Sequence, residues 1–266
     1  MLIIEPHNPF AVSFGWLRLR AKRLPQGGLF TFWSRSLAKT IIYIDGFNLY
    51  YSRLKGTAFK WLDLAALFRD QIVMQQDPNA QVLSIKFFTS PVKASYARHG
   101  QASEHAQTQY HRALLAKYPD LIEIINGFHI FQPTALPAFD EGQVPSKSKV
   151  SKVWMIEEKQ TDVNIALHAY RDVARGTCDQ AVICSNDSDL EPALRLIRQD
   201  VPTAIIGLVM PLRSSAVSDG KVPNKRLTPL SHWVRHHILD DELVRAQLPQ
   251  NVPTKKKPAA KPVHWS

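Results

Sequence analysis

The sequence has little cysteine and no long apolar run, and each absence removes a class of protein. Its two cysteines, Cys178 and Cys184, are too few for a disulfide framework and favour a reducing compartment, the cytoplasm. No run of about 18 apolar residues occurs, so no transmembrane helix is predicted. The dinucleotide-binding pattern G-x-G-x-x-G does not follow the first predicted strand. With 266 residues and 45% hydrophobic content, the chain suits one folded domain with tails.

The basic excess lies mostly near the two ends of the chain. Of the net charge of +10, residues 1–39 contribute six basic and one acidic side chain, and residues 251–266 contribute four lysines and no acid. The 40–250 segment holds 23 basic and 22 acidic residues, so its net charge is a weak indication of nucleic-acid binding. We therefore expect a flexible basic arm over 1–38, a folded domain over 39–245 and a disordered Lys/Pro-rich tail over 246–266.

Strand-like and helix-like patterns alternate through the domain. Strands are predicted at 40–44, 82–89, 121–131, 181–185 and 203–210, and helices at 62–73, 101–118, 156–174 and 190–198. Segments 132–153 and 211–229 are expected to be irregular. This alternation predicts an α/β fold with a mostly parallel sheet of five or six strands and helices on both faces.

Four aspartates lie where predicted strands end or helices begin: Asp45, Asp162, Asp187 and Asp189. Ligands of open α/β sheets bind at the carboxyl ends of the strands, so these side chains are expected at one edge. Their charges would repel one another, and a divalent cation, Mg²⁺ or Mn²⁺, is the simplest way to hold them together. The alternative for Asp187 and Asp189 is helix capping. For Asp162 it is a surface ion pair with Lys159, on the same face of the predicted helix.

The two segments expected to be irregular, 132–153 and 211–229, each follow a predicted strand and carry seven of the chain's basic residues between them. They are Lys147, Lys149, Lys152, Arg213, Lys221, Lys225 and Arg226. A basic rim around an acidic centre suits a polyanionic substrate. Solvated loops whose lysines aid solubility are the equal alternative.

Two tyrosines follow the first predicted strand directly. Tyr50 and Tyr51 could stack on a nucleobase or a pyridine ring. Aromatic residues in this place more often complete a core, and that interpretation is favoured here. Asn48 lies near Asp45 and is a candidate to bind substrate or orient a water.

Three segments taken together resemble one family. Residues 44–49 read IDGFNL, residues 158–163 read EKQTDV and residues 185–190 read SNDSDL. In this order and spacing they resemble the NYN domain family of the PIN-like nuclease superfamily, over residues 39–210. The resemblance implies a three-layer α/β fold with an Mg²⁺ site formed by Asp45, Asp162, Asp187 and Asp189, with Asn48 beside it.

The first hypothesis is Mg²⁺-dependent phosphodiester hydrolysis of RNA or another polyanion. A bound Mg²⁺ would lower the pKa of a water and stabilise the leaving oxygen. Lys159 would neutralise charge that develops on phosphorus.

The alternative comes from another branch of the same family. The chain is also similar to members described as NADH-dependent monooxygenases of 6-hydroxy-3-succinoylpyridine, in nicotine breakdown. That resemblance implies NADH as cofactor and a small pyridine as substrate. Neither a dinucleotide signature nor a clear iron-binding triad in the residues supports redox chemistry.

Overall fold

A six-stranded parallel sheet forms the centre of the domain. The computed structural model describes residues 37–214 and 222–265. The strand order is β3-β2-β1-β6-β7-β8, and all neighbouring strands run parallel. Their bounds are β1 Ala38–Asp45, β2 Ala80–Thr89, β3 Ile122–Asn126, β6 Gln180–Cys184, β7 Ile205–Val209 and β8 Trp233–Arg235. The predicted fold class is confirmed.

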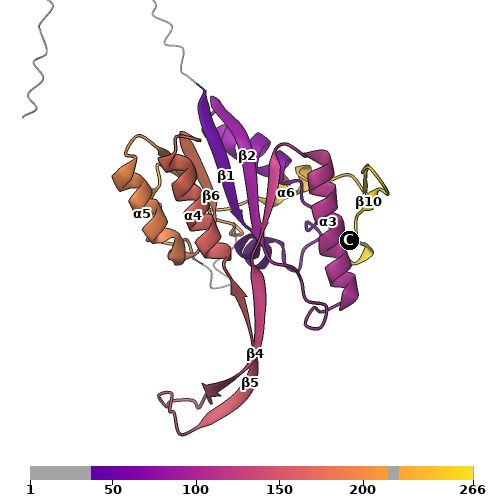
Figure 1. Ribbon diagram of the computed structural model, residues 1–266, viewed down its shortest axis with the longest axis vertical. Coiled ribbons are helices and arrows are strands. Elements are labelled where there is room, and N and C mark those ends of the chain that lie inside the picture. Colours follow the sequence, from indigo (N-terminus) through magenta and orange to yellow (C-terminus); the bar gives the residue numbers. More distant parts are fainter. Residues whose placement is uncertain (1–36, 215–221, 266) are drawn as a thin grey trace, which may run out of the picture. The chain divides into compact units, whose positions relative to one another are not determined.

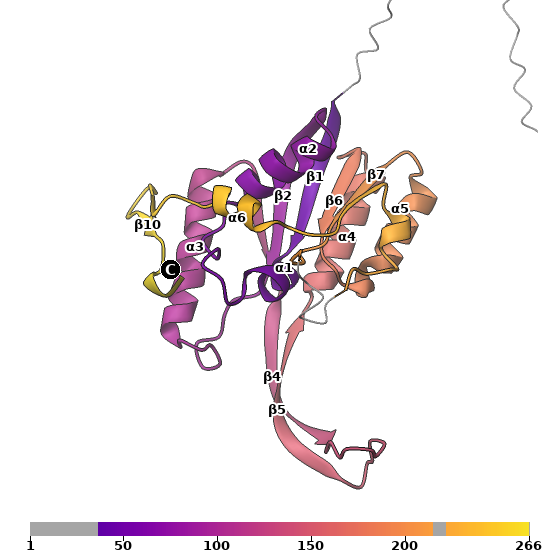
Figure 2. The ribbon, with the colours of Figure 1, turned by 180° about the vertical axis from the view of Figure 1, so that it is seen from behind.

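Helices cover both faces of the sheet (Figures 1 and 2). One face carries η2 (Ala65–Val73), α3 (Gln101–Lys117) and α6 (Asp240–Arg245), and the other carries α4 (Thr161–Ala174) and α5 (Glu191–Asp200). Short helices include α1 (Gly46–Leu49), η1 (Tyr50–Leu54) and α2 (Met74–Gln76). Among the described residues, no helix is long and apolar enough to cross a membrane.

Alternating side chains of β1 bind the two layers together. Ile42 and Ile44 are fully buried in the core under η2 and α3, while Ile41 and Tyr43 join the core under α4 and α5. Successive residues of a strand point to opposite faces, so a run of apolar residues fills both cores.

The strand order reverses between β1 and β6. From β1 the chain builds outward to β2 and β3 on one side, and later from β6 to β7 and β8 on the other. Such a reversal leaves a crevice outside the carboxyl ends of the two central strands, where open α/β sheets bind ligands. Asp45 ends β1, and Ser185 follows β6.

A long antiparallel hairpin replaces what the sequence suggested was a loop and the start of a helix. β4 (Phe128–Pro137) pairs with β5 (Val150–Lys159), and the hairpin extends from the carboxyl edge of the sheet (Figure 1). The prediction of a helix from 156 was therefore wrong, and the segment 132–153 is irregular only between the two strands, over 138–149. Helix α4 begins only at Thr161, after Gln160 takes a left-handed conformation with φ of 76°.

Gly127 marks the point where the hairpin leaves the sheet. A Cβ atom there would lie 2.4 Å from the carbonyl oxygen of Lys159 and 2.8 Å from Oγ1 of Thr161. The backbones approach too closely for any side chain. Hence the strand predicted over 121–131 is divided into β3 and β4 at this glycine.

The C-terminal segment packs on the domain, contrary to the expected disordered tail. It forms β9 (Asn251–Val252), β10 (Ala259–Ala260) and η6 (Val263–Trp265). Val252 and Ala259 are buried in the core beside α3. The domain thus continues to residue 265, past the predicted boundary at 245. The predicted arm over 1–38 lies almost wholly outside the described residues.

Candidate functional site

Asp45 is the buried centre of the crevice between β1 and β6. Asp45 is only 3% exposed. Oδ1 accepts a hydrogen bond of 2.8 Å from the backbone N–H of Asn48, and Oδ2 accepts one of 2.9 Å from the hydroxyl of Ser185. Burial raises the pKa of Asp45 to about 6 despite these two donors. The negative charges of Asp187 and Glu158 raise it further.

Asp162 shares this electrostatic environment from the first turn of α4. Burial raises its pKa to about 7, and the charges of Asp45 and Asp187 add to the effect, followed by those of Glu158 and Asp189. The raised pKa thus reflects first the burial of this carboxyl group and then the negative charges close to it. We call Asp45, Glu158, Asp162, Asp187 and Asp189 the acidic cluster.

Asp187 serves as a helix cap within the cluster. Its Oδ1 accepts a hydrogen bond of 2.9 Å from the backbone N–H of Asp189, at the start of the short helix η3 (Ser188–Leu190). The Asp187 N–H in turn donates to Ser185 Oγ at 3.1 Å. Asp189 itself is exposed. Asp187 therefore caps η3 through Oδ1.

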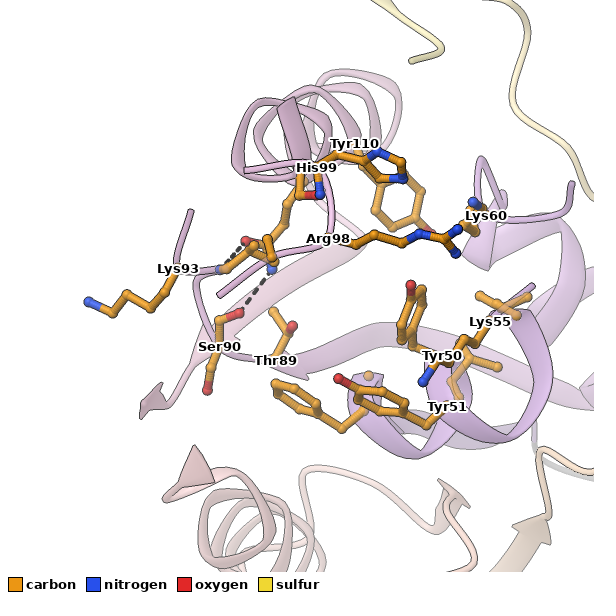
Figure 3. Close-up of a pocket in the computed structure, with 18 of the residues that line it drawn as sticks. Tyr50, Tyr51, Lys55, Lys60, Thr89, Ser90, Lys93, Arg98, His99 and Tyr110 are labelled. Carbon is orange, nitrogen blue, oxygen red and sulfur yellow. Dashed lines mark hydrogen bonds between the residues drawn. The ribbon is translucent and has the colours of Figure 1, made fainter. Parts of the chain in front are cut away.

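A cavity of about 620 Å³ opens beside the cluster on the same edge of the sheet (Figure 3). Aromatic side chains form much of its wall: Phe47, Tyr50, Tyr51, Phe87, Tyr110 and Trp265. Tyr50 is 39% exposed and Tyr51 52% exposed, so the favoured prediction that they complete a core was wrong. Phe47 and Tyr51 are stacked, with ring centroids 6.2 Å apart, and Tyr50 meets Tyr51 edge-on at 5.1 Å.

Basic side chains also line this cavity, across from Tyr50 and beside Tyr110 (Figure 3). Lys60, Arg98 and His99 line it from the loops that precede η2 and α3, and His264 lines it from η6. In Figure 3, Arg98 and Lys60 point toward one another above Tyr50. Cavities of this size with an apolar lining and a few charged groups are typical of small-molecule sites.

Ser90 connects the cavity to the acidic cluster. The residue lines the cavity, is 1% exposed, and donates a hydrogen bond of 3.1 Å from Oγ to Oε1 of Glu158. Gly46 also lines the cavity, one residue after Asp45. A ligand in the cavity would therefore lie against the elements that hold the carboxylates.

The profile of the NYN domain matches residues 39–219, which include the sheet edge and the acidic cluster. The chain belongs to the NYN family. A relative from Pseudomonas putida, named 6-hydroxy-3-succinoylpyridine 3-monooxygenase HspA, is 38% identical over 241 residues, which cover 85% of this chain and 75% of the relative. A solved structure of a protein of unknown function from Vibrio parahaemolyticus is 17% identical with a TM-score of 0.43, covering 78% of this chain and 97% of that one.

Hydrogen bonds of asparagine side chains connect the two sides of the NYN crevice. Asn48 Oδ1 accepts a hydrogen bond of 3.2 Å from the backbone N–H of Asn186, which links α1 to the segment after β6. Asn186 in turn accepts from the backbone N–H of Asn224 at 2.8 Å. This contact brings Lys225 and Arg226, both exposed, to the β6 side of the crevice. Asn48 thus positions the backbone of the site.

The other predicted rim residues do not gather at the acidic cluster. Lys147, Lys149 and Lys152 lie on the hairpin and its turn, and Lys149 pairs with Asp140 at 2.5 Å. Arg213 donates to the carbonyl of Lys55 at 3.1 Å, on the cavity side. Lys221 lies outside the described residues. The single basic rim expected from the sequence is divided between the hairpin, the crevice and the cavity.

Glu158, and not the predicted Lys159, lies in the acidic cluster. Lys159 ends β5 and pairs with Glu157 at 2.5 Å, so the expected helix face shared with Asp162 does not exist. Glu158, which the sequence analysis missed, joins the cluster and accepts from Ser90 and from the hydroxyl of Thr161. The residues around it suggested the start of a helix, so its place in β5, one residue before the strand ends and close to Gly127, was not recognised.

The donors of the NYN acidic cluster suit a hard divalent cation. Carboxylate oxygens are the ligands that Mg²⁺ prefers, and mutual repulsion that raises two pKa values would be relieved by a positive ion. Among the described residues, however, no group of three or more ligand-type side chains is already arranged as a metal site. By the chemistry of the donors, Asp45, Asp162 and Asp187 are the residues that would hold the ion.

Proposed function

We propose that this chain is a monooxygenase that hydroxylates a small pyridine carrying a carboxylate, of the kind named for its Pseudomonas relative. One structural observation carries the proposal: a 620 Å³ cavity with an aromatic wall and a cationic wall, placed at the carboxyl edge of the sheet. The aromatic wall offers a face for a heteroaromatic ring. The cationic wall offers charge-assisted hydrogen bonds to an acid group.

The cavity suits a small ligand better than a nucleic-acid strand. Its lining residues come from α1, η1, the loop before α3, the hairpin and η6, and they enclose a volume in the usual range for small molecules. The 40–250 segment is near neutral overall, so its net charge gives little support to polyanion binding.

In this proposal, the residues that line the cavity bind the substrate and orient it. Hydroxylation by a monooxygenase places one atom of O₂ in the substrate and reduces the other to water, with two electrons from a donor such as NADH. The crevice between β1 and β6, where a dinucleotide would bind in a Rossmann-type sheet, is lined here by carboxylates. Those negative charges do not fit a pyrophosphate.

A second candidate function is metal-dependent phosphodiester hydrolysis. The observation that favours it is the acidic cluster, in which burial and like charge raise the pKa values of Asp45 and Asp162 to about 6 and about 7. Perturbed carboxylates at a topological switch point are typical of functional sites. When bound, a divalent cation supplies an activated water and stabilises a leaving oxygen.

One experiment separates the two functions. Purified protein is incubated with 6-hydroxy-3-succinoylpyridine, NADH and air, and in parallel with labelled single-stranded RNA and Mg²⁺ or EDTA. Product formation is followed by mass spectrometry and by gel. Wild type is compared with Tyr50→Ala in the cavity, Asp45→Asn in the cluster and Asp70→Asn, an exposed carboxylate paired with Arg69, as the matched control.

We expect a hydroxylated pyridine from wild type and Asp70→Asn, and a strong loss in Tyr50→Ala. Oxidation of NADH without a hydroxylated product, or no reaction at all with the pyridine, would overturn the monooxygenase proposal. RNA cleavage that requires both the metal and Asp45 would establish the second candidate instead.

A further inference from the structure

The cationic wall of the cavity is assembled from three separate parts of the chain. Lys60 precedes η2, Arg98 and His99 precede α3, and His264 lies in η6 at the C-terminal end of the described residues. The C-terminal segment is therefore part of the cavity wall. The sequence alone indicated a tail here.

Contacts hold this wall in place. Lys60 Nζ donates to the backbone carbonyl of His264 at 3.5 Å, and the rings of His99 and His264 lie 4.9 Å apart. Trp265 packs against Trp61, with ring centroids 6.3 Å apart, and against Tyr110 at 5.8 Å. Since Trp61 is fully buried, the segment is anchored in the core.

The positive charge of the wall is not neutralised by the protein. In the part of the chain that the structure describes, none of its four basic side chains forms an ion pair with a carboxylate. Burial lowers the pKa of Lys60, and the nearby charges of Lys261 and Arg98 lower it further. The pKa of His264 is likewise lowered by burial and then by His99 and Lys60. Lys60 and Arg98 thus place positive charge at the cavity without a counter-charge, and the ring of His264, whose pKa is lowered, offers an N–H as a hydrogen-bond donor; both features favour an anionic ligand.

We propose that Lys60, Arg98 and His264 form a subsite for the carboxylate of the ligand, and that the C-terminal segment completes it. This inference rests on the proposed function, because it takes the aromatic acid as the occupant of the cavity. The Arg98 guanidinium offers two parallel hydrogen bonds to a carboxylate, and Lys60 adds a point charge beside it. The ring of the ligand then lies against the aromatic wall formed by Phe47, Tyr50 and Tyr51.

The test compares an acid with its neutral ester. Binding of 6-hydroxy-3-succinoylpyridine and of its methyl ester is measured by titration calorimetry on the full chain. The variants are Arg98→Gln and Lys60→Gln, with Lys256→Gln as the control, because Lys256 is an exposed lysine of the same C-terminal segment. Arg98 is itself exposed, so its replacement leaves the fold intact.

Wild type is expected to bind the acid about tenfold or more tightly than the ester. Arg98→Gln and Lys60→Gln should each weaken the acid by about tenfold and the ester by less than about twofold, while Lys256→Gln changes neither. Equal losses for acid and ester, or no loss, would overturn the carboxylate subsite while the proposed substrate stands.

Two further outcomes of these titrations would overturn the proposed substrate or the carboxylate assignment. If wild type binds neither ligand, the proposed substrate is wrong and the subsite falls with it. A parallel titration with NADH separates the two sources of an anionic group. If the variants lose affinity for NADH alone, the wall binds a dinucleotide phosphate and the carboxylate assignment is overturned.

Discussion

The Ser90 hydroxyl donates a 3.1 Å hydrogen bond to Glu158, and this bond joins the wall of the cavity to the acidic cluster. Glu158 Oε1 also accepts from the hydroxyl of Thr161, at the start of α4. Two donors thus hold the hairpin end of β5 against β2 and α4. Glu158 is thus positioned by Ser90, which follows β2 and is distant in the sequence, and by Thr161, three residues further along the chain at the start of α4.

Ser90→Ala removes one donor from a partly buried carboxylate. We expect the free energy of unfolding to fall by about 1–2 kcal/mol, because a hydrogen bond to a charged acceptor is lost. Urea denaturation measures this change. Ser146→Ala, which alters an exposed hydroxyl in the hairpin turn, should change stability by less than about 0.5 kcal/mol. Equal effects of the two substitutions would show that the Ser90 contact does not hold the site.

The acidic cluster makes stability depend on pH. Folding raises the pKa of Asp162 from 3.8 to about 7, so the folded state binds this proton more tightly than the unfolded chain does. Stability is therefore lost as pH rises through this window, since the folded state then holds a buried charge among like charges. Asp45, with a pKa of about 6, acts in the same direction.

Asp162→Asn should remove part of this pH dependence. We expect it to stabilise the protein by about 1 kcal/mol near pH 8, after allowance for the partial exposure of the side chain, and by much less near pH 4.5. Chemical denaturation at the two pH values gives the comparison, with Asp70→Asn as the control. If Asp162→Asn increases the free energy of unfolding by the same amount at both pH values, the neighbouring carboxylates do not destabilise the charged form of Asp162.

The sheet and most of the acidic cluster could be predicted from the sequence, because local signals mark them. Apolar runs followed by polar turns fixed the ends of β1 and β6, and parallel strands place such ends at one edge. Asp45, Asp162, Asp187 and Asp189 therefore came together as expected, close enough for their charges to act on one another.

The hairpin and the cavity could not be predicted, because both depend on contacts between distant segments. Residues 150–159 carry charged and apolar side chains in a pattern that also suits the first turns of a helix, and only pairing with β4 makes them a strand. The exposure of Tyr50 and Tyr51 depends on the loop before α3 and on η6, which stand opposite them. The many lysines and prolines of the C-terminal segment led to the prediction that it is disordered. In the structure, Val252, Ala259 and Trp265 pack into or against the core and hold the segment on the domain.

A divalent cation should stabilise the domain if the acidic cluster binds it. A ligand that binds only the folded state stabilises it by an amount that grows with the logarithm of the ratio of ligand concentration to dissociation constant, and so raises the midpoint of thermal unfolding. We expect Mg²⁺ or Mn²⁺ at about 100 times its dissociation constant to add about 2.7 kcal/mol, measured by thermal denaturation. Asp45→Asn and Asp162→Asn should abolish the gain, and Asp70→Asn should keep it. Identical midpoints with the metal and with EDTA would assign the cluster a role that does not involve a cation.

An aromatic stack joins the hairpin to the cavity. Tyr96, which lines the cavity, stacks on Phe131 of β4 with ring centroids 3.5 Å apart, and Phe131 stacks on Trp154 of β5 at 5.0 Å. The loop that carries Arg98 is therefore held by the hairpin through Tyr96. This arrangement gives the hairpin an effect on ligand binding, although most of it lies away from the cavity.

Phe131→Ala should weaken ligand binding without touching the ligand. Loss of the stacking contact, which contributes about 0.5–1.5 kcal/mol, frees Tyr96 and the loop before α3, so we expect affinity for the pyridine acid to fall about threefold to tenfold. Titration calorimetry measures the loss, and hydrogen exchange over residues 92–100 should quicken in the same variant because the loop opens more often. Phe139→Ala is the matched control, since Phe139 is 92% exposed near the hairpin turn. If affinity falls equally in both variants, the effect comes from the hairpin as a whole. If affinity is unchanged in Phe131→Ala while exchange quickens, the position of the loop does not limit binding.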